Sequence, residues 1–390
     1  MAIGSRSKLA AWRVGAVLAA ALVAREAPAA GWSKEEAPIP APTLALMAAR
    51  NTTPSAPILI RTYKKEAELE VWKKARDGRF VHLKTFPVCR WSGQLGPKLR
   101  QGDRQAPEGF YSVAPRQMNP NSAYHLSFDI GFPNAYDRAH GATGKYLMVH
   151  GICSSAGCYA MTDRQIEEIY ALAREAFRGG QPAFQFQAYP FRMTAQNMAR
   201  HRSDPHIAFW RQLKEGSDRF EAAGEEPSVA VANGRYAFGP STDAAREALA
   251  RTRRADEDAR IAKLIEDGVA AVRTTYADGG QHPSFRTLAS AGAPSLGIVS
   301  RPEALALAGR EIVVVPARPK RPVQVAETKA VPAVAPTASI AAGPGAELSV
   351  FSPTPLGSTW RVPAQATLAG SARILPPALT RKPIEVAAHW

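Results

Sequence analysis

Short apolar stretches with polar residues at alternate positions recur between residues 58 and 238, separated by turn residues. This pattern is typical of β-strands bounded by tight turns. In the last long stretch, phenylalanine and glutamine alternate over residues 184–187, which predicts a strand with one face in water. The predicted strands are Ile58–Tyr63, Leu69–Trp72, Phe80–Phe86, Gly109–Val113, His125–Ile130, Lys145–His150 and Ala183–Tyr189.

A helical period replaces the alternation after Thr162. Thr162 and Gln165 have the spacing of a capping box, in which two side chains satisfy backbone N–H groups at the start of a helix. Apolar residues follow at helical spacing, and Gly179-Gly180 ends the run, so one amphipathic helix is predicted here. Its apolar positions are Ile166, Ile169, Tyr170, Ala173 and Phe177.

Three shorter elements are predicted downstream. Thr194 is placed to cap a short helix that starts at Ala195, and a further helix covers Ile207–Leu213. Residues 229–238 read as two strands around Asn233-Gly234. Asn-Gly is the pair that type I′ hairpin turns favour, so the sequence predicts a hairpin.

The character of the sequence changes near residue 240. Residues 242–273 have a charged helical pattern with sparse apolar positions, which indicates a helix in solvent. Farther on, Ala, Pro, Val and Ser predominate, as in disordered or polyproline segments. We therefore predict a linker at 30–57, a mainly β domain at 58–240, a charged helical segment at 241–278 and a disordered low-complexity tail at 279–390.

The first thirty residues have the order of a secretory signal peptide. Basic residues without an acid precede an uninterrupted apolar run at residues 14–24, and Ala27-Pro28-Ala29 has the form of a cleavage site. An uncleaved membrane anchor is the alternative, but this run is too short to cross about 30 Å of hydrocarbon. We therefore expect cleavage near Ala29 and an exported, periplasmic protein.

Charge and cysteine content narrow the class of protein. The chain of 390 residues has 49 Lys and Arg against 34 Asp and Glu, a net charge of +15, which favours anionic partners. The export signal argues against nucleic acid as that partner. Three cysteines exclude a disulfide scaffold, and without a CxxC pair they do not indicate a zinc site.

The segment Lys145–Asp163 carries the most informative chemistry. A predicted strand ends on His150-Gly151, and a turn rich in Ser and Gly delivers Cys158 near the helix that Thr162 caps. A helix N-terminus favours thiolate over thiol, and His150 is placed to take the proton. Backbone N–H groups near Cys158 and Gly157 would form an oxyanion hole. The alternative is a buried cysteine and a core histidine without catalytic roles.

This segment resembles the active-site motif of the L,D-transpeptidase (YkuD-type) family, and most closely its murein transpeptidase branch. The similarity extends beyond HGICSSAGCYAMTD. The other motifs, in order around it, are RTYKKEAELEVW, FPVCRWSGQLGPKLRQGD, APEGFYSV, IGFPNAYDRAHG, GQPAFQF, YPFRMT and VANGRYAF. The resemblance implies a mainly β sandwich or open barrel with a few surface helices, and it implies no metal or other cofactor.

The resemblance also assigns roles. Cys158 would be the nucleophile that forms a thioester, and His150 the general base, oriented through the backbone near Gly151. Ser155 and Gly157 fall in the SxGC turn, where they would serve substrate or oxyanion binding. The wider family reads SHGC followed by Arg, whereas this chain has Ala156 and Ala160 at those positions. Contacts to the acceptor are therefore expected to differ.

The loop that precedes the catalytic strand offers further candidates. Arg138, beside Tyr136, could hold the carboxylate of a diaminopimelate side chain through two hydrogen bonds, or it could pair with an acid for purely structural reasons. His140 is the alternative base. Cys89 and Cys153 are a possible disulfide, which an oxidising compartment permits.

Three functions follow as expectations. The first is acyl transfer on peptidoglycan stem peptides, giving 3→3 crosslinks or attachment to the lysine of an outer-membrane lipoprotein. With water as acceptor, the same chemistry becomes amidase or peptidase activity. The third is a non-catalytic wall-binding protein, and in each case the basic tail would contact an anionic wall or membrane surface.

Overall fold

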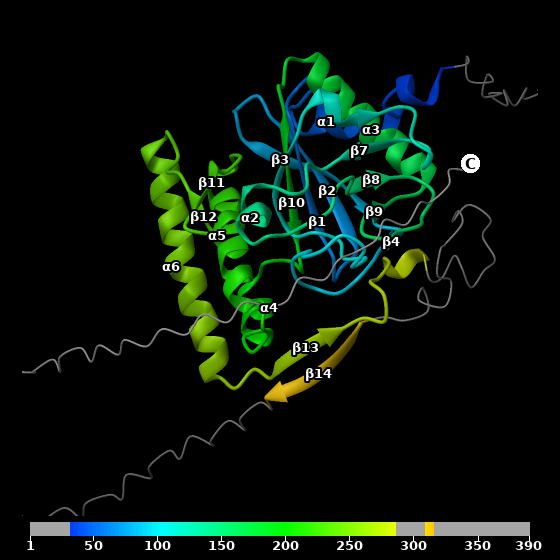
Figure 1. Cartoon of the computed structure of the whole chain (residues 1–390). Helices are drawn as coiled ribbons and strands as arrows, with labels where there is room; N and C mark the ends of the chain where they lie inside the picture. Colours follow the sequence, from blue (N-terminus) through cyan, green and yellow to red (C-terminus); the bar gives the residue numbers. More distant parts are fainter. Residues whose placement is uncertain (1–31, 286–308, 316–390) are drawn as a thin grey trace, which may run out of the picture. The chain divides into compact units, whose positions relative to one another are not determined.

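The computed structural model describes residues 32–285 and 309–315 (Figure 1). The predicted signal peptide and most of the predicted tail lie outside the described residues. Among the residues described, the helices are η1 (Lys34–Glu36), α1 (Ala41–Ala49), η2 (Pro115–Gln117), α2 (Ala135–Ala139), α3 (Asp163–Arg178), α4 (Ala195–Arg200), α5 (Ile207–Ala223) and α6 (Ala244–Glu266).

Two mixed sheets form the centre of the described chain. The first has the order β3-β2-β1-β10-β5, with β1 and β10 parallel and the other neighbours antiparallel. The bounds of its strands are β1 (Ile58–Tyr63), β2 (Glu68–Lys74), β3 (Phe80–Pro87), β5 (Gly109–Val113) and β10 (Phe184–Tyr189). Each of them contains or overlaps a stretch that the sequence predicted as a strand.

The second sheet has the order β4-β9-β8-β7-β6, in which only β8 and β9 are parallel among the described pairs. Its strands are short: β4 (Arg90–Trp91), β6 (Met118–Asn119), β7 (Ser127–Asp129), β8 (Met148–His150) and β9 (Tyr159–Ala160). Aromatic side chains pack between the two sheets. The ring centroid of Phe128 in β7 lies 5.7 Å from that of Phe184 and 6.4 Å from that of Phe186 in β10. The mixed sheets and several helices are consistent with the predicted mainly β fold.

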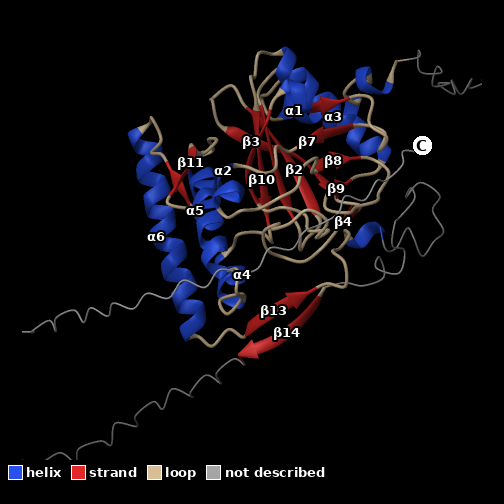
Figure 2. Ribbon diagram, viewed as in Figure 1, coloured by secondary structure: helices blue, strands red, loops and turns tan. Residues whose placement is uncertain are grey.

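Helix α5 covers the other face of the first sheet, and Figure 2 shows α5 between that sheet and α6. Arg61 of β1 reaches α5, where it donates to Ser217 at 2.8 Å and pairs with Glu221. The prediction of one face in water is therefore wrong. Gln185 and Gln187 are buried and hydrogen-bonded. The prediction failed because the periodicity of a strand cannot reveal a segment that packs on it later in the chain.

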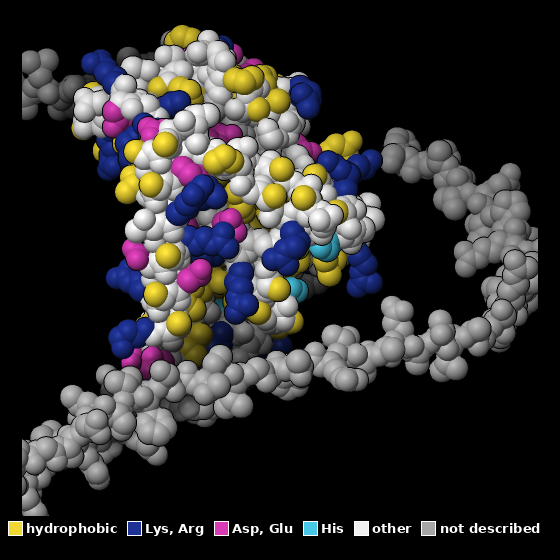
Figure 3. Space-filling view, turned by 90° about the vertical axis from the view of Figure 1, so that its left-hand side faces the viewer, with side chains coloured by type: hydrophobic (Ala, Val, Ile, Leu, Met, Phe, Trp, Pro, Cys, Tyr) yellow, Lys and Arg dark blue, Asp and Glu magenta, His cyan; other side chains and the backbone are white. Residues whose placement is uncertain are grey.

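Helix α6 packs on α5 through charged groups. Lys214 of α5 lies 2.5 Å from Asp218 and 2.9 Å from Glu257 of α6, and all three are buried. The opposite side of α6 carries many exposed charged side chains, as expected, and Figure 3 shows Lys and Arg interspersed with acids on this face of the molecule. The hairpin β11 (Val229–Ala232) and β12 (Arg235–Phe238) is found around Asn233-Gly234.

Two expectations about the flanking regions are wrong. The predicted linker contains the helices η1 and α1. Helix α1 packs on the β domain, since its Thr43 and Met47 are buried and Thr43 donates to Glu168 of α3 at 2.5 Å. The region 241–278 is not helical throughout, since α6 ends at Glu266 and β13 (Ala271–Thr275) follows.

The beginning of the predicted disordered tail is also ordered. β14 (Arg310–Val315) pairs antiparallel with β13, and Phe285 is buried beside Cys89 and Cys153. Phe285 thus adds to a small cluster on the β domain, whereas the apolar side chains of β14, Ile312 to Val315, are exposed and β14 is held by its pairing with β13.

Candidate active site

Three neighbouring strands place the predicted catalytic residues on one face of the second sheet. Phe128, Val149 and Tyr159 lie side by side in β7, β8 and β9, and all three belong to the core. Because side chains alternate along a strand, the residues next to them point to the opposite face. That face carries one row of Asp129, Met148 and Cys158 and a second row of Ser127, His150 and Ala160.

His150 and Cys158 are therefore diagonal neighbours on this face. One strand spacing and two residues of rise separate them, which puts their Cα atoms roughly 8 Å apart. An imidazole and a thiol can span most of that distance. Strand pairing, and not the turn alone, brings the two residues together.

His150 is held in a single orientation and tautomer. Its Nδ1 lies 2.6 Å from the carbonyl oxygen of Gly151, and the Tyr124 ring packs against it with centroids 4.6 Å apart. Since a carbonyl oxygen only accepts, Nδ1 carries the proton and Nε2 has a free lone pair. Burial lowers the pKa of His150, and the Gly151 carbonyl opposes this only in part. The ring is neutral at pH 7 and able to accept a proton.

Cys158 is the free thiol of the chain and is partly buried. Its Sγ accepts the N–H of Met148 at 3.4 Å and lies 3.9 Å from the carbonyl oxygen of Tyr146. Burial raises the pKa of Cys158 to about 11, with the Met148 N–H lowering it, Asp129 raising it and Lys98 lowering it. The resting group is a neutral thiol.

The expected effect of the helix N-terminus on Cys158 is wrong. Thr162 does cap α3, and its side chain accepts the N–H of Gln165. However, strand β9 lies between Cys158 and that helix, and the N–H that contacts Sγ belongs to β8. Within the described residues, the neutral imidazole of His150 lies on the same sheet face as this thiol.

Ser155 ties the turn that presents the thiol. Its Oγ accepts the N–H groups of Cys158 at 3.1 Å and Gly157 at 3.3 Å, and it donates to the Cys158 carbonyl at 2.7 Å. In this conformation both N–H groups are engaged by Ser155, so it shapes the turn in place of the expected oxyanion contact. Gly157 has φ +131°, and a Cβ there would lie 3.2 Å from Leu147 Cδ1.

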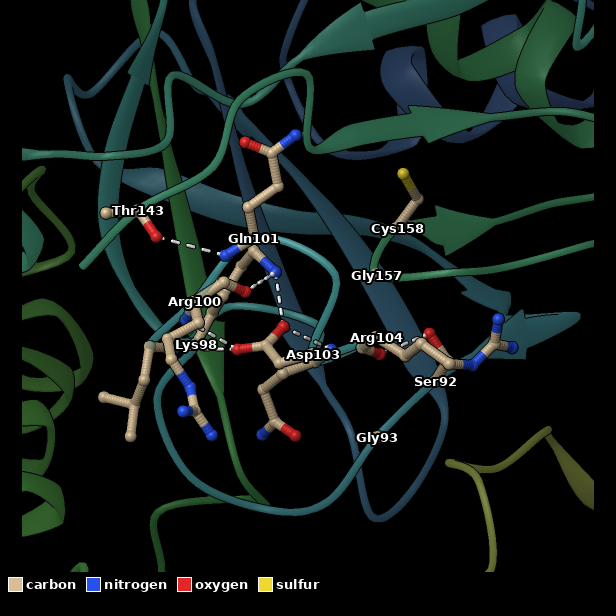
Figure 4. Close-up of polar contacts among 12 residues, drawn as sticks. Ser92, Gly93, Lys98, Arg100, Gln101, Asp103, Arg104, Thr143, Gly157 and Cys158 are labelled. Atoms are coloured by element: carbon tan, nitrogen blue, oxygen red, sulfur yellow. Dashed lines mark hydrogen bonds and ion pairs between the residues drawn. The ribbon is translucent and has the colours of Figure 1, made fainter. Parts of the chain in front are cut away.

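A loop between β4 and β5 lies beside the turn, and Figure 4 shows it next to Gly157 and Cys158. Asp103 holds this loop by pairing with Lys98 and accepting the N–H of Arg100 at 2.8 Å. Burial would raise the pKa of Asp103, but Lys98 and the backbone N–H groups lower it overall. Hydrogen bonds and an ion pair of Asp103 thus hold the conformation of this loop beside the turn that carries Cys158.

The candidates in the preceding loop lie elsewhere. Tyr136 of α2 is buried and stacks on His140 at 4.1 Å and on Tyr236 at 4.7 Å. Arg138 donates to the Pro133 carbonyl. Within the described chain, these residues contact one another, α2, Pro133 and Tyr236, so the structure does not bring Arg138, Tyr136 or the alternative base His140 to the thiol.

The sequence analysis did not single out three further residues near Cys158 and His150. Tyr124 covers His150, and Ser127 lies opposite His150 in the strand pairing with a buried Oγ that has no hydrogen-bond partner among the described residues. Asp129 lies in the row of Cys158, and burial raises its pKa. The alternation in HLSFDI could have indicated Ser127 and Asp129, because they flank the core residue Phe128 and therefore point to the other face of the sheet.

Cys89 and Cys153 form a disulfide that spans 64 residues. Replacing both with serine is expected to lower the free energy of unfolding by about 2–4 kcal/mol, since the cross-link restricts the unfolded chain, while Cys158 continues to turn over substrate. Urea denaturation of the double variant, followed by an activity assay, checks this. Complete loss of turnover at unchanged stability would contradict it.

The raised pKa of Cys158 has a measurable consequence. The rate of alkylation by iodoacetamide is expected to climb about tenfold per pH unit from pH 7 to pH 10, because the thiolate fraction rises throughout, whereas an ordinary thiol levels off near pH 8.5. Cys158 is the free cysteine, so mass spectrometry follows it directly. A plateau below pH 9 would show that the thiol is not buried as described.

Two curated proteins from Escherichia coli, of strain K12 and of O157:H7, are similar to this chain, and each is named "Putative L,D-transpeptidase YafK". Each is 50% identical over 181 residues, which are 46% of this chain and 73% of the relative. No family model matches the chain. On the strength of these relatives, the chain belongs to the L,D-transpeptidase (YkuD-type) family, in its YafK-like branch.

Solved structures are less similar. The helical cell shape determining protein Pgp2 from Campylobacter jejuni matches with a TM-score of 0.28 and 14% identity, over 60% of this chain and 80% of Pgp2. Bd1075 from Bdellovibrio bacteriovorus matches with a TM-score of 0.26 and 13% identity, over 56% of this chain and 75% of Bd1075. Likeness at this level carries no argument about function.

Among residues 32–285 and 309–315, no group of three His, Cys, Asp or Glu side chains is arranged to hold a metal ion. In the same ranges, no helix has both the length and the apolar character needed to cross a membrane.

Proposed function

We propose that this protein is an exported, periplasmic enzyme that transfers an acyl group of a peptidoglycan stem peptide through a thioester on Cys158. The observation that carries the proposal is the common face of Cys158 and His150, with His150 neutral and anchored on Gly151. His150 Nε2 takes the thiol proton as Sγ attacks the amide carbonyl carbon. The departing amine then receives that proton from His150, which leaves the acyl group on sulfur.

The acceptor decides the product. We place an amine first, from a second stem peptide or from a lipoprotein lysine, so that an amide replaces the thioester and the free thiol returns. His150 accepts the proton of the attacking amine and passes it back to sulfur. An amine acceptor gains its advantage over water from being held close to the thioester.

Hydrolysis is the second candidate, and a specific observation favours it. Ala160 lies directly opposite His150 in the strand pairing and is buried, and Ala156 is exposed in the turn. Two small apolar side chains replace the His and Arg that the resemblance leads one to expect. An acceptor amine would have fewer polar contacts here, which makes water more competitive.

Mass analysis of products distinguishes these reactions. The purified protein is incubated with tetrapeptide muropeptides and, separately, with murein that carries bound lipoprotein. Dimers joined 3→3 or newly attached lipoprotein support transfer, whereas released lipoprotein without new crosslinks supports hydrolysis. Absence of any product, combined with retention on murein, would leave the wall-binding alternative in place of both.

A further inference from the structure

The segment after β13 lies along the edge of the second sheet. Backbone hydrogen bonds join Gly279 N to the Gly93 carbonyl at 2.7 Å and join Trp91 and Gly280 in both directions at 3.0 and 3.1 Å. His282 N donates to the Val88 carbonyl at 3.0 Å. This segment, Asp278–Phe285, therefore continues the sheet beyond β4, and we name it the strap.

Close approach fixes the sequence at one position of the strap. Gly279 has φ +70°, and a Cβ there would lie 2.0 Å from the Trp91 carbonyl oxygen. A larger residue would have to push the strap off β4. The strap thus packs closely against the edge of the sheet at β4.

The side chain of Asp278 faces the loop beside the active site. Its carboxylate lies 2.8 Å from Arg104 Nη2 and 3.6 Å from Arg90 Nη2, and it accepts the N–H of Gly93 at 3.3 Å. The carboxylate is 6% exposed. Burial would raise the pKa of Asp278, but the hydrogen bond and charge of Arg104 lower it overall, so Asp278 is an anion at neutral pH.

Arg104 passes this contact on to the cysteine turn. The same Nη2 that binds Asp278 donates to the carbonyl oxygen of Ser155 at 3.2 Å. Ser155 in turn binds the N–H and the carbonyl of Cys158 through its Oγ. Ser92 lies between the same two residues, since its Oγ donates to the Arg104 carbonyl at 2.7 Å and is in contact with Ser155 Oγ at 3.0 Å.

The other end of the strap supports the same turn from a second side. Phe285 is 5% exposed and packs with the Cys89–Cys153 disulfide. Cys153 lies two residues before Ser155. One end of the strap therefore contacts Arg104, which binds Ser155, and the other end contacts the disulfide of Cys153.

We infer that the strap is a positioning element of the active site, in which Asp278 acts through Arg104 to hold the Ser155 carbonyl and thereby the turn that presents Cys158. Asp278 and Arg104 are positioning residues and need not touch substrate. A displacement of about 1 Å in a reacting group is enough to cost on the order of a hundredfold in rate. The kinetic part of this inference rests on the proposed function, whereas the thiol geometry does not.

Arg104→Gln is the first test, because Arg104 is partly exposed and its loss leaves Asp278 with Arg90 and Gly93. We expect kcat on soluble muropeptides to fall about tenfold or more with KM nearly unchanged, since Arg104 orients the nucleophile without binding substrate. Alkylation of Cys158 at pH 9 should become several-fold faster, because a loosened turn buries the thiol less. Arg104→Lys, which retains one charged donor, should restore part of both properties.

Arg100→Gln is the matched control, since Arg100 is an exposed arginine in the same loop. It should behave as wild type in both assays. Asp278→Asn should reproduce the effect of Arg104→Gln and add little to it in the double variant, because both changes break one chain of contacts. If Asp278→Asn does not fold, Arg104→Gln and its control still decide the question.

The outcomes separate this inference from the proposed function. Wild-type kcat and a wild-type alkylation profile in folded Arg104→Gln would overturn the positioning role. If wild-type protein forms no product from muropeptides, the proposed function fails, and the alkylation profiles alone then decide the role of the strap. Faster alkylation only above the onset of melting would count against the inference, since general unfolding would explain it.

Discussion

Replacing Cys158 with serine is expected to lower turnover of muropeptides by at least about a thousandfold while leaving the fold intact. Serine is nearly the same size, so the hydrogen bond from the Met148 N–H can be kept. Its hydroxyl is far less acidic than a thiol, and a neutral histidine alone cannot ionise it at neutral pH. Product formation is measured by mass spectrometry, and folding by circular dichroism and melting temperature.

Ala156→Ser is the matched control for this change. It adds a hydroxyl in the same turn, two residues from the nucleophile, at a position that is exposed. We expect its activity to remain close to that of wild type. Equal activity of Cys158→Ser and wild type would remove the thioester from the mechanism, and binding of murein without turnover in both proteins would favour a wall-binding role.

Local patterns were sufficient to predict all five strands of the first sheet and the helix that starts after Thr162. There, alternation, a capping box and turn residues act within a few positions of one another. The short strands of the second sheet are different. β9 has only two residues, Tyr159 and Ala160, and its pairing with β8, not its composition, makes it a strand. For this reason the environment of Cys158 was predicted wrongly from the sequence, and its role as nucleophile stays a prediction.

Contacts between distant segments set the remaining limits. Asp278 and Arg104 are 174 positions apart in the chain, and no local pattern links an acid at the end of the predicted charged segment to an arginine in a loop. Gln185 and Gln187 likewise look like solvent-facing residues of a strand, but both are buried, and Gln185 donates to the carbonyl of the distant Pro227. A sequence pattern records the faces of an element, but it does not record which later segment covers them.

The carboxylate of Asp129 illustrates an intermediate case. Its position beside the core residue Phe128 could have been deduced from alternation, but its place in the row of Cys158 depends on two strand pairings. Those pairings are long-range and become visible only in the folded chain. Candidate catalytic residues can thus be proposed from a sequence motif, whereas the charges that surround them depend on strand pairing.

Replacing His150 with glutamine is expected to cost nearly as much turnover at pH 7 as the change at Cys158, because residues that act as a unit are not additive. The mechanism needs a neutral base, and burial lowers the pKa of His150. Wild-type activity should therefore fall as the pH drops through this lowered pKa, and it should level off above it.

The pH profile of the His150 variant makes the prediction specific. Without a base, only the spontaneously ionised thiol can react, and burial raises the pKa of Cys158 to about 11. The residual activity of His150→Gln should therefore climb about tenfold per pH unit from pH 7 to pH 10, where wild type is flat. His140→Gln is the control, since His140 stacks on Tyr136 and binds its carbonyl at 2.9 Å. A greater loss in His140→Gln than in His150→Gln, or a flat profile in the latter, would mean that another group takes the proton from Cys158.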